Sequence, residues 1–460
     1  MALTPVLLVG GAVTGVTGVP TGSASTATPA RPNIVLILTD DQRVDTLDTM
    51  PVVRRELVAK GETFTGVIPT STCCPSRVSL FTGLFSHNTG VYNNVGPTVG
   101  GWRAFHASGH EGATFATALH AAGYRTALFG KYLNGWSMSP QDFVPPGWDD
   151  FMAIRSDSPN LRLGSSAYYN YRLTGTEPTQ SYGNTPADYS TDVLANLAVD
   201  FVKKSVPGGP FFVEYSTTAP HGPMTPAPRD VGTWSTSTPY DNQAVNEAGM
   251  SDKPGFMQGL PRVPRAYIDQ TQTKTMESLM AVDEGVQRII NAVGVESTNT
   301  LFIFMSDNGV MWGEHRLRAK NKPYRWSTEV PMTMRWDGHF TPGTSGGLVA
   351  NVDVTATMLD AARIPGALAM DGRSVLTSKR SSLVLEAVNT VDHPAYCGIR
   401  TQNWLYVRYS GTQGVELYDY AKDPLELHNL AYLPQYLAKR EELRVATHRA
   451  CSPVPPRFAW

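Results

Sequence analysis

Asn33-Ile-Val-Leu-Ile-Leu-Thr-Asp-Asp41 joins an unbroken apolar run to two acidic residues, and it gives the first indication of the fold class. A short apolar run bounded by polar residues is typical of a strand that is buried on both faces of a sheet. Similar runs occur at Thr126–Phe129, Phe211–Tyr215 and Thr300–Met305. The sequence therefore predicts at least four central strands.

Helical patterns separate these predicted strands, at Ala113–Ala122, Asp192–Lys204 and Thr271–Val293. Strands that alternate with helices predict an α/β fold with helices on both faces of one sheet. After about residue 345 the pattern changes, because Trp404–Tyr409 and Val415–Tyr418 alternate like hairpin strands.

We predict three parts of the chain from these patterns. They are an N-terminal signal-like or disordered segment over residues 1–30, a main domain over 31–345 and a small C-terminal α+β subdomain over 346–460. Residues 223–270, which are rich in Pro, Gly, Ser and Thr, read as a long loop that shapes access to a site.

Chemically capable residues follow each predicted central strand. They are Asp40 and Asp41, Lys131, His221, and Asp307 with Asn308. Ligands of open α/β sheets bind outside the carboxyl ends of the strands, so we expect these residues to converge on one edge.

The acidic members of this set, Asp40, Asp41, Asp307 and Asn308, offer three carboxylates and one amide. Hard oxygen ligands select Ca²⁺ or Mg²⁺ over zinc. One Asp-Asp pair after a strand is more often a loop or a helix cap, but a second acidic motif at another strand end favours a metal site.

The stretch Pro69–Gly83 contains Cys73-Cys74-Pro75-Ser76-Arg77. Proline favours the first helical position, so we expect Cys73 just before a helix N-terminus, where unpaired N–H groups favour an anion. Arg77 lies one helical turn later and can face the same site. A buried cysteine pair beside a helix cap is the alternative.

The chain has 460 residues, of which 41% are hydrophobic and 17% charged, and its formal net charge is −2. This length supports a large buried core and favours two domains. A nearly neutral chain has no overall field that draws it to nucleic acid or a membrane surface.

The N-terminal residues resemble a secretory signal. Ala2–Val19 is apolar and Thr21–Ala30 is rich in Ser, Thr, Ala and Pro, although no Lys or Arg precedes Arg31. We expect export to a periplasmic, extracellular or lysosome-like compartment and no stable membrane anchor, with a disordered tail as the alternative. In an exported protein Cys397 and Cys451 would form a disulfide or remain buried thiols, and the sequence leaves both open.

The cysteine stretch resembles the signature of the type I sulfatases, Cys-x-Pro-Ser-Arg followed by x-x-Leu-x-Thr-Gly, which Leu80, Thr82 and Gly83 complete. The resemblance implies an alkaline-phosphatase-like fold. It also implies that a maturation enzyme oxidises Cys73 to formylglycine, whose hydrated aldehyde attacks sulfur and later expels sulfate.

Other motifs extend the resemblance over about residues 32–431. Asp40-Asp41 and Ser306-Asp307-Asn308-Gly309 resemble the family's metal motifs, which implies one Ca²⁺, with Mg²⁺ less expected and residue 73 as a further ligand. Gly123–Lys131 resembles the second signature, with Lys131 facing the sulfate. Many members have a histidine where this chain has Leu133.

The remaining catalytic candidates are His221, Arg77 and Lys320. Ala219-Pro-His221-Gly-Pro223 resembles the family's Pro-His motif, and Lys320 matches the last family lysine, with Lys322 as its competitor. We expect these cations to stabilise charge on the sulfate and the leaving oxygen, and His221 or Lys320 to act as the acid.

The chain looks most similar to the N-acetylglucosamine-6-sulfatases within this family, through Cys-Cys-Pro-Ser-Arg, Gly130-Lys-Tyr-Leu-Asn134 and Tyr168-Tyr-Asn-Tyr-Arg-Leu173. The resemblance implies hydrolysis of sulfate monoesters of sugars or aryl alcohols. A phosphodiester or phosphonate monoester hydrolase and a non-catalytic protein that binds sulfated glycans are the alternatives.

Overall fold

The computed structural model describes residues 1–8, 10–11, 30–96, 98–136, 139–140, 143–155, 167–234 and 240–460. Residues Arg31–Trp460 form one unit, and Met1–Ala30 form another. Most of the predicted signal-like segment and residues 235–239 of the predicted loop lie outside the described residues. Within these ranges no helix has the length and apolarity needed to cross a membrane.

Four parallel strands form the centre of a large mixed sheet. In spatial order they are β8 (Thr300–Ser306), β1 (Asn33–Asp40), β7 (Phe211–Pro220) and β3 (Arg125–Gly130). Every residue of β1, β7 and β8 is buried, as expected for strands covered on both faces. All four correspond to the apolar runs, so this prediction is confirmed.

Shorter strands extend the sheet on both sides. Beyond β8 lie β10 (Met332–Arg335), β2 (Glu62–Val67) and β11 (Gly343–Ala350), and beyond β3 lie β4 (Asp150–Arg155), β5 (Arg172–Gly175) and β6 (Gln180–Ser181), with β9 (Glu329–Val330) paired to β2. Antiparallel pairing of β10 with β8 and of β5 with β4 makes the sheet mixed.

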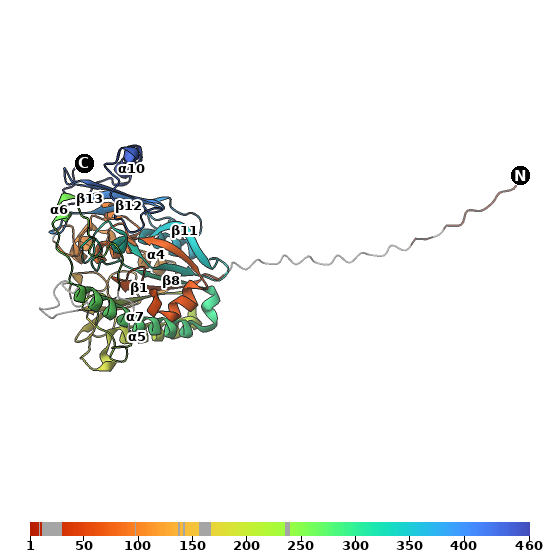
Figure 1. Ribbon diagram of the computed structural model, residues 1–460. Helices are drawn as coiled ribbons and strands as arrows, with labels where there is room; N and C mark the ends of the chain where they lie inside the picture. Colours follow the sequence, from red (N-terminus) through yellow and green to blue (C-terminus); the bar gives the residue numbers. More distant parts are fainter. Residues whose placement is uncertain are drawn as a thin grey trace. The chain divides into compact units, whose positions relative to one another are not determined.

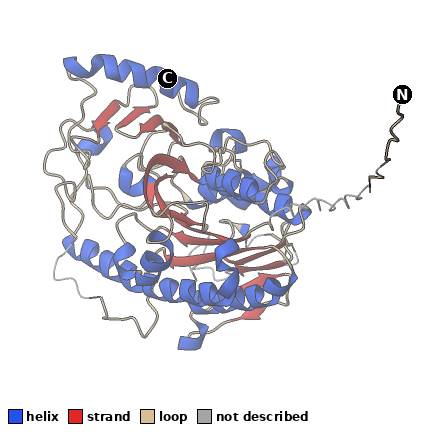
Figure 2. Cartoon of the chain, turned by 90° about the vertical axis from the view of Figure 1, so that its right-hand side faces the viewer, coloured by secondary structure: helices blue, strands red, loops and turns tan. Residues whose placement is uncertain are grey.

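Helices cover both faces of this sheet, as predicted. α5 (Ser190–Ser205) and α7 (Arg265–Val293) lie along one face, while α1 (Cys73–Thr82), α4 (Phe115–Ala121) and α9 (Asn351–Ala361) lie on the other (Figures 1 and 2). Side chains alternate along β1, so Ile34 and Leu36 join the core on the α1 side and Val35 and Ile37 the core on the α7 side. The shorter helices are α2 (Ser86–Thr89), α3 (Gly101–Ser108), α6 (Gly255–Gln258) and α8 (Arg325–Thr328).

A second, antiparallel sheet forms from the C-terminal part of the chain. It contains β12 (Ser382–Ala387), β13 (Tyr396–Thr401), β14 (Trp404–Tyr409) and β15 (Val415–Asp419), followed by α10 (Leu437–Ala450). β14 and β15 are the two predicted hairpin strands. A disulfide joins Cys397 of β13 to Cys451 after α10, so of the two alternatives the structure has the disulfide.

Candidate active site

The four central strands place their following residues at one edge of the sheet. Asp40 ends β1, Lys131 follows β3, His221 follows β7 and Asp307 follows β8. Because these strands run parallel, their carboxyl ends share that edge, which is where α/β sheets bind ligands. Asp40 and Asp307 are almost fully buried there.

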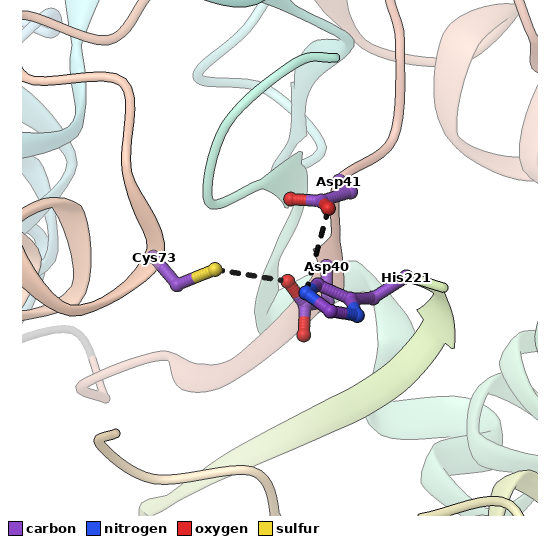
Figure 3. Close-up of side chains that lie close together, drawn as sticks. All are labelled: Asp40, Asp41, Cys73 and His221. Atoms are coloured by element: carbon purple, nitrogen blue, oxygen red, sulfur yellow. Dashed lines mark hydrogen bonds and ion pairs between the residues drawn. The ribbon is translucent and has the colours of Figure 1, made fainter. Parts of the chain in front are cut away.

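Cys73 reaches this edge from the first residue of α1. The helix begins at Cys73 and not after it, because Pro75 occupies the third position, where a missing N–H breaks no helical hydrogen bond. The Cys73 thiol donates to Oδ1 of Asp40 at 3.4 Å, and the ammonium of Lys320 lies 2.7 Å from Sγ. Figure 3 shows the thiol pointing toward Asp40, with the His221 ring beside Asp40 and Asp41.

Arg77 ties α1 to three of the central strands. Its Nε donates to Oδ2 of Asp307 at 2.8 Å, and its Nη1 donates to the Lys131 carbonyl at 2.8 Å and to Oγ of Ser216 at 2.7 Å. The side chain is fully buried. Cys73 and Arg77 thus face one site, and Ser216 joins it although its sequence context gives no sign of this role.

Two lysines pair with the two adjacent aspartates. Lys131 donates to Oδ2 of Asp40 and lies 3.9 Å from Oδ2 of Asp307, while Lys320 donates to Oδ1 of Asp41. Lys322, the competitor of Lys320, instead reaches the Lys320 carbonyl at 3.5 Å. The structure therefore brings Lys320 into the site and leaves Lys322 outside it.

Opposite charges control the ionisation of the carboxylates. Burial alone would raise the pKa of Asp40, but Lys131 and His221 outweigh burial and lower this pKa to about 2. Burial and the Asp40 carboxylate raise the pKa of the Cys73 thiol to about 12. The encoded thiol is therefore protonated near neutral pH, and a protonated thiol is a weak nucleophile.

His221 contacts Oδ2 of Asp41, whereas Lys320 contacts Oδ1. Its Nε2 is 3.6 Å from Oδ2 of Asp41, and its Nδ1 is 2.8 Å from the Gly222 carbonyl. A carbonyl only accepts hydrogen bonds, so Nδ1 carries a proton and Nε2 is the atom turned to the site.

The structure gathers Asp40, Asp41 and Cys73 of the predicted metal set and adds His221, so this group holds two carboxylates, a thiol and an imidazole. Ligand atoms of Asp40, Asp41, Cys73 and His221 lie within 4.8 Å of one another. Nδ2 of Asn308 donates to Oδ1 of Asp41 at 2.6 Å, whereas its buried Oδ1 has no hydrogen-bond partner among the described residues. A buried amide oxygen without a donor is costly, and a cation would satisfy it.

Two further positions define the surroundings of the site. Glu214 of β7 is fully buried, and neither carboxylate oxygen has a hydrogen-bond partner in the described part of the chain. An acidic residue inside the apolar run Phe211–Tyr215 was the signal that could have identified it. Leu133 occupies the position at which the second signature often has a histidine. It is buried in the hydrophobic cluster on the α1 side.

Comparison with known proteins places this site in a family context. The model of the Sulfatase family matches residues 32–364, and the model described as N-sulphoglucosamine sulphohydrolase, C-terminal, matches residues 313–450. The first match spans well over half of the chain and contains every site residue described above.

Two animal proteins illustrate the sequence similarity. The chain is 34% identical over 358 residues to a putative extracellular sulfatase Sulf-1 homolog of Caenorhabditis elegans, covering 75% of this chain but 48% of that protein. It is 32% identical over 395 residues to human N-acetylglucosamine-6-sulfatase, covering 82% of this chain and 68% of that protein. The chain thus spans about half of the nematode protein and two thirds of the human one.

A solved structure shows the same fold. That structure contains a protein in complex with its substrate D-glucosamine-2-N,6-O-disulfate. It matches with a TM-score of 0.74 at 22% identity, covering 91% of the present chain and 97% of the other chain. The predicted alkaline-phosphatase-like α/β architecture, with helices on both faces of one sheet and a small C-terminal subdomain, is confirmed.

Proposed function

The chain belongs to the sulfatase family, and on that premise we propose that it hydrolyses sulfate monoesters at the edge of the large sheet. The observation that carries the proposal is the position of Cys73, which contacts both Asp40 and Lys320 at the start of α1. A nucleophile made at residue 73 would lie between carboxylates that can hold a cation and ammonium groups that can hold an anion.

The chain's own cations account for the charge that develops in the reaction. Hydrolysis moves negative charge among the sulfate oxygens and onto the leaving oxygen, and fixed cations in a buried site stabilise such charge. We assign this role to Lys131, Lys320 and Arg77. A sugar oxygen is a poor leaving group and needs a proton, for which His221 Nε2 or Lys320 is the candidate donor.

The proposal includes two groups beyond the encoded side chains. Asp40, Asp41, Asp307 and Asn308 would hold Ca²⁺, with residue 73 as a further ligand, and the ion would polarise the sulfate. A hydrated formylglycine made from Cys73 by a maturation enzyme would supply the attacking oxygen and a second hydroxyl through which sulfate is released.

We further propose a sulfated sugar, such as an N-acetylglucosamine 6-sulfate unit, as the substrate, and export from the cytosol. The names of the human and nematode relatives support the first and second points, respectively. The disulfide between Cys397 and Cys451 also supports export, because disulfides persist in oxidising compartments.

Mass spectrometry of the tryptic peptide Gly61–Arg77, followed by sulfate release assays, tests the proposal. We expect an aldehyde in place of the Cys73 thiol, and loss of turnover in both Cys73→Ala and Asp307→Ala. Full activity in either variant would overturn the assignment. Faster turnover of phosphodiester or phosphonate esters would replace it with the phosphoester activity, and glycan binding without sulfate release with a binding role.

A further inference from the structure

A cleft of about 1220 Å³ opens beside the loop that carries Lys320. Ala319 and Lys322, two residues close to Lys320 on either side of it, line the cleft, while the ammonium of Lys320 contacts Cys73. Pockets for small ligands usually measure about 300–1,000 Å³. The cleft therefore lies next to the loop that carries the site residue Lys320, and it exceeds the usual size for one small ligand.

Three segments from different parts of the chain form most of its walls. They are residues 256–267 of the predicted access loop and the start of α7, residues 316–322, and residues 389–395 between β12 and β13. The cleft is thus built where the loop, the Lys320 segment and the C-terminal part of the chain meet.

The charge of this cleft is strongly positive. Among its described lining residues five are Arg or Lys and one, Asp392, is acidic, whereas the chain as a whole has a net charge of −2. A surface lined by one sign of charge raises the local concentration of oppositely charged ligands. We call this surface the basic cleft, and its cations are Arg262, Arg316, Arg318, Lys322 and Arg457.

The structure separates cations that hold the cleft together from cations that are available to a ligand. Arg316 donates to the carbonyls of Glu247 and Leu260 at 3.0 and 3.1 Å, and Lys322 lies 3.6 Å from Asp392. The remaining three are exposed, and in the described part of the chain no carboxylate pairs with them; they are Arg262, Arg318 and Arg457.

An aromatic face adjoins these arginines. The guanidinium of Arg318 lies over the ring of Tyr267, 5.2 Å from its centroid, and Tyr267 lines the cleft. An arginine held on an aromatic ring keeps its planar fork of donors ordered, and that fork suits carboxylate and similar oxyanions.

We propose that the basic cleft binds the part of an anionic glycan that neighbours the sugar whose sulfate ester is cleaved. This proposal rests on the proposed sulfatase activity and defines its substrate class. The substrate is an oligosaccharide with further sulfate or carboxylate groups, and Arg262, Arg318 and Arg457 determine this specificity.

The test compares substrates that do and do not extend into the cleft. The variants are Arg318→Ser and the triple replacement of Arg262, Arg318 and Arg457 by Ser, with exposed Arg54→Ser, outside the cleft lining, as the matched control. Each is assayed with 4-nitrophenyl sulfate, with N-acetylglucosamine 6-sulfate and with a uronate-containing sulfated glucosamine tetrasaccharide.

We expect the triple variant to raise KM for the tetrasaccharide about tenfold, because three exposed ion pairs each contribute modestly. Turnover of the two small substrates should remain within about twofold of wild type, and added NaCl should raise the wild-type KM for the tetrasaccharide by screening. Unchanged tetrasaccharide kinetics, or equal losses on all three substrates, would overturn the proposal.

A binding measurement keeps this proposal separate from the proposed activity. In a Cys73→Ala background, the tetrasaccharide Kd should rise about tenfold when the three arginines are replaced, and a desulfated tetrasaccharide should bind poorly to both proteins. Absence of sulfate release from every substrate by wild-type protein would contradict the activity. A tetrasaccharide Kd that does not respond to the arginines would contradict the basic cleft.

Discussion

At the scale of single residues, Glu214 is a buried acid whose carboxylate oxygens have no hydrogen-bond partner among the described residues. Burial raises its pKa from 4.5 to about 7, although Arg77 opposes the shift. The folded protein therefore binds this proton more tightly than the unfolded chain does. Protonated Glu214 therefore makes its full contribution to the free energy of unfolding below about pH 4.5. This contribution declines as the pH rises to about 7, and the free energy of unfolding no longer changes with this group above that pH.

We expect Glu214→Gln to remove this decline. Urea unfolding at pH 5 and pH 7.5 should show that the free energy of unfolding of wild type, relative to the variant, falls by roughly 2 kcal/mol across this range. Exposed Glu177→Gln serves as the control and should keep the wild-type dependence. The assignment fails if the Glu214→Gln and wild-type curves remain parallel.

Arg77 leads to a second prediction at this scale. Its guanidinium bonds Asp307, Ser216 and the Lys131 carbonyl at once, and a lysine in its place cannot reproduce that fork. We expect Arg77→Lys to lower the free energy of unfolding by about 3–5 kcal/mol, as for other broken buried ion pairs, and to abolish most sulfate release. Thermal unfolding and a sulfate assay measure the two effects.

The control for this change is Arg54→Lys. Arg54 pairs with Asp48 at 3.4 Å on the surface, where both side chains are more than half exposed, so the same replacement should have little effect. Equal behaviour of the two variants would mean that the Arg77 network does not hold the strand ends together.

Sequence patterns identified the residues at strand ends but not their partners. Asp40, Lys131 and Asp307 each follow an apolar run, so their convergence could be predicted from the order of elements alone. Ser216 could not be found in this way, because its role depends on register: β7 pairs it with Gly130, directly before Lys131. Side-chain partners across strands follow from that register and not from local sequence.

At the scale of elements, the strands of the large sheet that could be predicted are those buried on both faces. β1, β3, β7 and β8 each contain an apolar run and are buried along nearly their whole length, whereas strands toward the edges, such as β6 and β11, are exposed or contain Gly and Ser. Such strands carry no hydrophobic run, so they form because a neighbour offers hydrogen bonds.

The backbone at Gly130 illustrates a local requirement that also positions the site. Its φ is +125°, and a Cβ there would lie 1.8 Å from the Ser216 carbonyl oxygen. Only glycine allows β3 to end this close to β7. Lys131 follows Gly130 directly. The backbone conformation that requires glycine therefore also helps to place this site lysine.

The prediction for the C-terminal elements concerns the disulfide that joins β13 to Cys451, directly after α10. It closes a loop with a sequence separation of 54 residues, and loop closure of this length stabilises a fold by about 4 kcal/mol. We expect the double variant Cys397→Ser/Cys451→Ser to unfold at a lower temperature, while 4-nitrophenyl sulfate turnover below that temperature stays near wild type.

Dithiothreitol provides the matching control, because it should lower the unfolding temperature of wild type and leave the double variant unchanged. Since Arg457 follows Cys451, the same variant should also bind the sulfated tetrasaccharide more weakly. An unfolding temperature equal to that of wild type would show that packing of Phe458 and its neighbours, and not the bond, holds this segment.

At the scale of the whole molecule, the carboxylates at the sheet edge would link binding of the proposed Ca²⁺ to global stability. Asp40 ends β1, Asp307 follows the adjacent strand β8, and both residues are buried. An ion that binds only the folded state stabilises it by mass action, about 2.7 kcal/mol at a concentration 100 times its Kd. The thermal unfolding temperature should therefore rise with the logarithm of the Ca²⁺ concentration.

We expect EGTA to lower both the unfolding temperature and sulfate release, and Ca²⁺ to restore both more fully than Mg²⁺. A cage of protein oxygens suits Ca²⁺, whereas Mg²⁺ usually retains several waters. Asp307→Asn removes one carboxylate charge at nearly constant volume, so it should flatten the dependence of the unfolding temperature on Ca²⁺.

Glu177→Gln, a charge change of the same size on the surface, should leave that dependence intact. If EGTA left wild type unchanged, or if Asp307→Asn responded to Ca²⁺ as wild type does, then Lys131, Lys320 and Arg77 alone would balance these carboxylates and the proposed metal site would be wrong.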